Sequence, residues 1–169
     1  PGEVRAVGSY VNAQSTDVRN HGMLYEGRID GTNGQWTQID VPTNLAGGTV
    51  WNTIVHSNMG DLAVGNYDIY GEPLSGNAFI YNIRTGDYIL FDEAFGGTRQ
   101  GTTAYGIWQN GEGSDHYTIV GGSKHGIGAN QAYVANYNAA TGEFSDIKYY
   151  TFEGRPEAIT HFEISVSAQ

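Results

Sequence analysis

Aromatic side chains offer the clearest binding chemistry in this chain. There are 12 Tyr, 6 Phe and 3 Trp among 169 residues. The face of an aromatic ring can pack against the C–H face of a sugar, while nearby amide and carboxylate groups bind its hydroxyls. Trp51, Tyr105 and Trp108 are the candidate glycan-binding residues, because we expect their segments at the most solvated edge of each structural unit.

The acids, bases and hydroxyls do not form a recognisable catalytic pattern. Asp115 and His116 are adjacent, and neighbouring side chains on a strand point to opposite faces. The segment Gly121–Gly126 only superficially resembles a nucleophile turn, because it lacks the Gly-x-Ser-x-Gly pattern. Asp92-Glu93 could supply one carboxylate of a glycosidase pair, but the sequence identifies no second one. We therefore expect no catalytic residues and no enzyme activity.

The histidines and acidic loops do not predict a metal site or a cofactor. The histidines lack the short paired spacings of zinc ligands: His21, His56, His116, His125 and His161. His56 and His161 hold near-equivalent positions in the repeat described below and could share one site. Residues 30–34 resemble part of a Ca²⁺ loop, but they lack its further acids and closing Glu. A hairpin turn is the preferred interpretation of that segment.

An internal repeat of about 56 residues organises the chain. Ala6-Val7-Gly8-Ser9-Tyr10 recurs as Ala63-Val64-Gly65-Asn66-Tyr67 and as Ile119-Val120-Gly121-Gly122-Ser123. These matches divide a single domain, residues 1–169, into repeats 1–62, 63–118 and 119–169. A repeat of this length is typical of a unit that buries its apolar face only by stacking on its own copies.

Each repeat contains four short segments. The first is the match above, and the second centres on Met23, Phe79 or Tyr133. The third begins with an aromatic residue two places after a glycine: Trp36, Tyr88 and Phe144. The looser fourth segments cover residues 49–55, 102–108 and 157–165. We expect the six aromatic or Met residues of the second and third segments to pack between repeats.

The segments predict an all-β protein of about twelve strands in three four-stranded units. They are rich in β-branched and aromatic residues and are bounded by Gly, Asn and Asp. Residues 78–83 are apolar on both faces, as in a propeller blade covered on both sides. A β-trefoil is the alternative. Since three blades make a poor closed ring, we expect a second copy or a larger assembly to complete it.

Composition limits the partners. The formal net charge of −10 argues against nucleic acid and anionic membranes, which need basic patches. No apolar run approaches the length of a membrane span, and there is no Cys to form a disulfide. The chain begins at Pro1, so we expect that a leader was removed. Together with the acidic, Gly-rich composition, this predicts a secreted protein.

Short motifs recur at matching places in the repeat. His21-Gly22-Met23, Asn77-Ala78-Phe79 and Gln131-Ala132-Tyr133 each follow a strand that contains Val-Gly. Thr103-Ala104-Tyr105-Gly106-Ile107 is followed by Asn110-Gly111. In these features the chain resembles secreted bacterial repeat proteins named for a His-Ala-Phe tripeptide, although only His21 keeps the histidine. The resemblance implies a secreted, propeller-like repeat and no established activity.

Two functions remain open from the sequence. The first is a non-catalytic extracellular module that assembles with itself in a surface layer, sheath, filament or matrix. The alternative is a lectin-like module that binds extracellular glycans and completes a propeller by homo-oligomerisation. The repeats favour the first, and the aromatic side chains favour the second.

Overall fold

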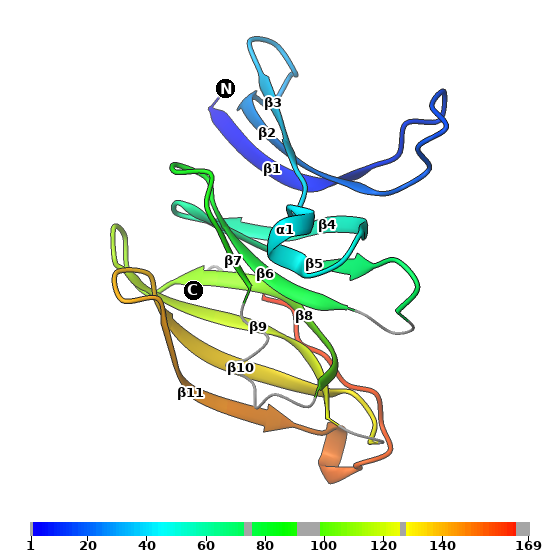
Figure 1. Cartoon of the computed structure of the whole chain (residues 1–169). Helices are drawn as coiled ribbons and strands as arrows, with labels where there is room; N and C mark the ends of the chain where they lie inside the picture. The colour runs from blue at the N-terminus through cyan, green and yellow to red at the C-terminus, as the bar shows by residue number, and fades with distance from the viewer. Residues whose placement is uncertain (1, 73–75, 91–98, 126–127, 165–169) are drawn as a thin grey trace.

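The chain folds into three antiparallel sheets layered one on another (Figure 1). The computed structural model describes residues 2–72, 76–90, 99–125 and 128–164. The first sheet contains β1 (Glu3–Tyr10), β2 (His21–Arg28) and β3 (Gln35–Ile39). The second contains β4 (Val50–Met59), β5 (Leu62–Ile69), β6 (Asn77–Asn82) and β7 (Tyr88–Leu90). The third contains β8 (Arg99–Gln109), β9 (His116–His125), β10 (Gln131–Asn138) and β11 (Glu143–Tyr150).

The prediction of an all-β fold is confirmed, and repeats 1–62 and 63–118 supply four strands each, β1–β4 and β5–β8. The sheets contain three, four and four strands, and the described residues form eleven strands rather than the expected twelve. The sheets do not close into a ring within the parts of the chain that the structure describes. Neither a propeller nor a trefoil follows from this arrangement alone.

The sheets are out of phase with the sequence repeats. The fourth segment of the first repeat forms β4, which pairs with β5 of the second sheet. The fourth segment of the second repeat likewise forms β8, which pairs with β9. A tight turn explains the first pairing, because Met59 and Leu62 face each other across Gly60-Asp61, and Gly60 has a φ of 58°. The first and second repeats therefore each supply the first strand of the sheet that follows.

Both faces of the second sheet are buried, which explains its apolar sequence. On β6, Phe79 and Tyr81 face the first sheet, whereas Ala78 and Ile80 face the third. Leu24 and Ile39 meet the second sheet from one side, and a cluster on the third sheet meets it from the other: Ala104, Ile107, Tyr117, Ile119, Tyr133, Ala135 and Tyr137. A sheet covered on both faces does not alternate apolar and polar side chains.

The residues that the structure describes include two short helical turns. Helix α1 (Thr43–Ala46) follows Pro42 and ends at Gly47, whose φ is 75°. A 3₁₀ turn, η2 (Phe152–Gly154), follows β11. These turns are too short to give a helical sequence period, so the sequence did not predict them. Within the described ranges, no helix has the length and apolar character needed to cross a membrane.

The predicted fourth segment of the third repeat does not form a strand within its described part, which ends at Ile164. Residues 158–164 instead run against the third sheet without forming a strand. The Thr160 amide donates to the Asn130 carbonyl at 2.8 Å, and the Phe162 amide donates to Gly121 at 3.2 Å. We call residues 158–164 the C-terminal segment.

Candidate functional site

Each sheet carries a closely spaced, tilted pair of aromatic rings on adjacent strands. The ring centroids lie 4.8 or 4.9 Å apart in the three pairs Tyr25–Trp36, Tyr81–Tyr88 and Tyr137–Phe144. Rings at this separation and tilt attract each other beyond the effect of burial alone. The structure therefore places each of the predicted packing residues Trp36, Tyr88 and Phe144 against a tyrosine of the adjacent strand.

The pairs differ in what covers them. Tyr88 packs against the core between the first and second sheets, and Phe144 packs against the core between the second and third. Burial raises the pKa of the Tyr88 hydroxyl far above its ordinary value. Trp36 lies on the face of the first sheet that points away from the other two, and 66% of its surface is exposed.

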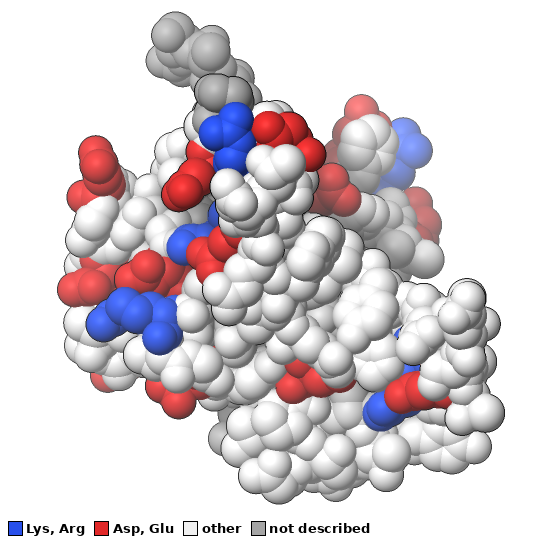
Figure 2. Space-filling model, turned by 90° about the horizontal axis from the view of Figure 1, so that it is seen from above, with Lys and Arg blue, Asp and Glu red and all other residues white. Residues whose placement is uncertain are grey.

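The second segments show the same contrast between buried residues in the second and third sheets and a less buried position in the first. Phe79 and Tyr133 are fully buried, whereas their counterpart Met23 is only partly buried on the outer face of the first sheet. We call this outer face the open face. It carries Val4, Ala6, Gly8, Tyr10, Met23, Tyr25, Trp36 and Gln38. Seen from above, uncharged side chains occupy much of the middle of this side of the molecule (Figure 2).

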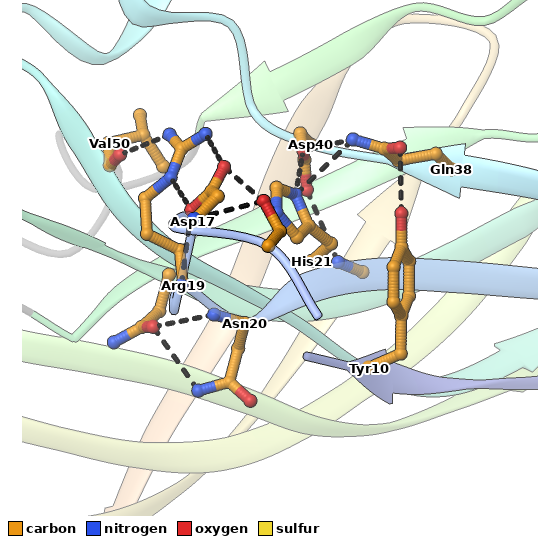
Figure 3. A network of polar contacts seen from close by, with 11 residues as sticks. Tyr10, Asp17, Arg19, Asn20, His21, Gln38, Asp40 and Val50 are labelled. Atoms are coloured by element: carbon orange, nitrogen blue, oxygen red, sulfur yellow. Dashed lines mark hydrogen bonds and ion pairs between the residues drawn. The ribbon is translucent and has the colours of Figure 1, made fainter. Parts of the chain in front are cut away.

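A polar network at one end of the open face surrounds His21 (Figure 3). Its Nδ1 lies 2.7 Å from Asp40 Oδ2, and its Nε2 lies 3.3 Å from Asp17 Oδ2. Gln38 donates to Asp40 at 2.6 Å and accepts from the Tyr10 hydroxyl at 2.8 Å. Because both imidazole nitrogens face carboxylates, neither is available as a base for a substrate.

The network ties the loop before β2 to two sheets. Asp17 binds the Arg19 guanidinium through two hydrogen bonds of 2.7 and 2.6 Å, and Arg19 also donates to the Val50 carbonyl of β4. The Arg19 guanidinium holds the pKa of the Asp17 carboxyl far below its ordinary value of 3.8. Asn20 adds a bond of 3.0 Å to the Asn52 side chain. We interpret this network as structural.

A cleft of about 730 Å³ lies between the second and third sheets. Its volume falls within the range typical of small-ligand sites. Trp51 and Tyr70 line one side, with ring centroids 5.3 Å apart and exposed fractions of 38% and 67%. The Tyr70 amide donates to the Thr49 carbonyl at 2.8 Å, which fixes Tyr70 next to β4. Polar and charged side chains complete the lining: Asp68, Glu72, Thr103, Lys124 and Asn130.

The structure does not bring the three candidate glycan-binding residues together. Trp51 lines the cleft, but Tyr105 and Trp108 lie elsewhere on β8 and are less exposed than the sequence suggested. Their strand, β8, is the first strand of the third sheet and packs against the second sheet, so it is not a solvated outer strand. The sequence missed Tyr70, because it follows a strand at a position with no aromatic counterpart in the other repeats. Trp51 and Tyr70 are neighbours only because β4 pairs with β5.

The remaining chemical candidates lie apart. Asp115 and His116 are exposed at a hairpin. Ser123 is fully buried, and its hydroxyl lies 3.1 Å from that of Thr102, so it is not placed as a nucleophile. Asp92-Glu93 lies outside the described residues. The Asp30 carboxylate accepts two hydrogen bonds from Thr32, which fits a turn.

His56 and His161 both contact the ring of Tyr105. The Tyr105 ring centroid lies 4.7 Å from that of His56 and 5.1 Å from that of His161. His56 Nε2 is 2.6 Å from Asn66 Oδ1. A site shared by the two histidines stays a prediction. Among the residues that the structure describes, no three His, Asp or Glu side chains are grouped as metal ligands.

Neither a protein-family model, nor a curated protein, nor a solved structure matches this chain. The resemblance to the His-Ala-Phe repeat proteins therefore stays a prediction. Any function has to be argued from the open face and the cleft.

Proposed function

We propose that this protein is a non-catalytic, secreted β-repeat module that assembles with copies of itself through the open face. The observation that carries the proposal is the exposure of Trp36. The equivalent residues Tyr88 and Phe144 each pack against the preceding sheet, whereas no sheet covers Trp36 within the described chain. The open face therefore carries the residue types of a contact between two sheets, but no second sheet packs against it within the described chain.

The physical argument is the free energy of covering apolar surface. Contiguous exposed apolar surface on a soluble protein commonly marks an interface. Burial of apolar area contributes roughly 25 cal/mol per Å². The acidic net charge does not oppose this contact strongly, because charged side chains are sparse at the centre of this face (Figure 2). A propeller-like ring of two chains, or a longer polymer, would follow from repeated contacts of this kind.

Light scattering behind a sizing column tests the proposal directly. We expect a species of at least twice 18.3 kDa at micromolar concentration. Trp36→Glu should shift it to 18.3 kDa, because the added charge would be buried in the contact. Ile29→Glu is the matched control, since Ile29 is 72% exposed in a neighbouring hairpin loop. If the unmodified chain is still a monomer at about 100 µM, roughly the dissociation constant of a weak complex, the proposal is contradicted.

A second candidate function is glycan binding in the cleft. The Trp51–Tyr70 pair favours it, because two exposed rings stand beside carboxylate, amide and ammonium groups that can bind hydroxyls. Retention of the protein on insoluble polysaccharides, compared with retention of a Trp51→Ala variant, tests this function. Assembly and glycan binding use different surfaces, so the two tests are independent.

A further inference from the structure

The outer edge of β1 differs from the equivalent edge in the other two sheets. β1, β5 and β9 are repeat-equivalent strands. β5 pairs with β4, and β9 pairs with β8, each supplied by the preceding repeat. Within the described residues, β1 pairs only with β2. Its other edge presents backbone groups that can pair with another strand.

Gly8, Gly65 and Gly121 hold equivalent positions in these three strands, and their surroundings show that β1 lacks the neighbouring strand that β5 and β9 have. A Cβ added at Gly65 would lie 2.0 Å from the Ile54 carbonyl oxygen, and one added at Gly121 would lie 1.9 Å from that of Thr103. Both carbonyls belong to the strand supplied by the preceding repeat. At Gly8, an added Cβ would meet only the flexible end of Met23, at 3.1 Å. Close strand pairing requires a glycine at this position, and Gly8 provides it. Within the described residues, however, no strand from a preceding repeat lies beside Gly8.

The C-terminal segment holds the position that such a strand would take. In β4 the Thr53 amide donates to the Asn20 carbonyl at 2.9 Å, and in β8 the Thr102 amide donates to Gly76 at 2.5 Å. The bond from Thr160 to Asn130 is the third equivalent, because each acceptor directly precedes a second segment. As β4 packs on the first sheet, so the C-terminal segment packs on the third. Its residues His161 and Ile164 lie close to Gly122 and Gly106 of the third sheet.

We propose that residues 160–164 of one copy pair antiparallel with β1 of a second copy and complete its first sheet as a fourth strand. The proposal rests on the proposed function of self-assembly and names the segment that makes the contact. The C-terminal segment stays where it lies on its own third sheet, so no refolding is needed. The open face of the second copy then covers that sheet, and both Trp36 and Trp108 lose exposed surface.

The repeat also fixes the register of this pairing. Ile54 faces Asn66, and Thr103 faces Gly122. The equivalent pair across the two copies is His161 opposite Ser9. Val55 faces Gly65, and Ala104 faces Gly121, which places Phe162 opposite Gly8.

A disulfide between copies tests the register. The chain has no Cys, so Ser9→Cys with His161→Cys introduces the only two thiols. Opposite residues of an antiparallel pair have Cα atoms about 4.5–5.5 Å apart, within the range for a disulfide. We expect a covalent dimer on a non-reducing gel after mild oxidation. Glu3→Cys with His161→Cys is the control. Glu3 lies about 20 Å further along β1 on the same face, and this pair should give less than a tenth as much dimer.

Gly8→Ala tests the same contact without a thiol. We expect its melting temperature to stay within about 3 °C of the unmodified chain at low protein concentration, because only Met23 must move. The association constant should fall at least tenfold, because the added Cβ would meet the His161 carbonyl of the other copy. Gly2→Ala is the control, since nothing lies within 4 Å of an added Cβ there.

The outcomes separate the two proposals. A specific disulfide together with weakened association in Gly8→Ala supports strand pairing. If the chain associates but neither variant differs from its control, strand pairing is wrong while assembly through the open face stands. If the unmodified chain is a monomer at all concentrations, both proposals are wrong.

Discussion

Tyr88 packs between two sheets, whereas Trp36, its counterpart one repeat earlier, is mostly exposed on the outside of the stack. Their partners Tyr81 and Tyr25 hold the same positions one strand away. One aromatic motif therefore serves as core in one sheet and as surface in another. Whether a residue of this motif stabilises the monomer depends on the presence of a preceding sheet.

This difference predicts unequal effects of truncating the two residues. Tyr88→Ala should lower the free energy of unfolding by about 2–4 kcal/mol, because it leaves a cavity between the first and second sheets. Trp36→Ala should lower it by less than about 1 kcal/mol at concentrations where the chain is a monomer. Urea unfolding of both variants at low micromolar concentration measures the difference. Equal losses would show that Trp36 is covered in the monomer.

The link between Asp17 and Arg19 predicts a specific acid sensitivity. Its hydrogen bonds to Arg19 lower the pKa of Asp17 below the ordinary 3.8, so its contribution to stability is complete above that pH. The contribution is lost as the pH falls from about 4 towards the pKa of the folded state. Asp17→Asn should therefore lower the urea midpoint at pH 7 and flatten its decline between pH 4 and pH 2.

The exposed Glu112, at the tip of a hairpin, provides the control for this measurement. Glu112→Gln should leave both the midpoint at pH 7 and its decline in acid unchanged. An Asp17→Asn variant that declines as steeply as the unmodified chain would assign the acid sensitivity to other carboxylates.

The strands could be predicted from the sequence because their signals are local. Residues 78–83 show apolar side chains on both faces, and the structure buries both faces of β6. The repeat also aligned Trp36, Tyr88 and Phe144, the third-segment members of the three aromatic pairs. These features depend on side-chain alternation and turn residues, which a short window of sequence contains.

The pairing of the fourth segments could not be predicted in the same way. Residues 49–55 are assigned by the repeat to the first unit, yet β4 pairs with β5 across the turn at Gly60. Pairing depends on which edge is free in three dimensions, and a repeat written along the chain does not contain that information. The cleft was missed for the same reason, since Trp51 and Tyr70 are neighbours only after this pairing forms.

Buried tyrosines predict a loss of stability in alkali. Tyr137 is 2% exposed between the second and third sheets, and burial raises the pKa of its hydroxyl above the ordinary 10. The unfolded chain therefore loses this proton first, and stability falls as the pH rises above about 10. Tyr137→Phe should reduce the fall in melting temperature between pH 9 and pH 11. Tyr70→Phe, at a position that is 67% exposed, should leave it unchanged.

The cleft predicts which residues a bound sugar would need. In Trp51→Ala and Tyr70→Ala the affinity for a retained polysaccharide should fall about tenfold or more, because each removes one face of the aromatic pair. Tyr70→Phe should keep most of the affinity, since the ring remains. Phe152→Ala removes an aromatic side chain that is 57% exposed outside the cleft, and it should bind like the unmodified chain. Depletion of each protein from solution by increasing amounts of polysaccharide measures these affinities. If Phe152→Ala and Trp51→Ala lose affinity equally, the polysaccharide binds exposed aromatic side chains in general rather than the cleft.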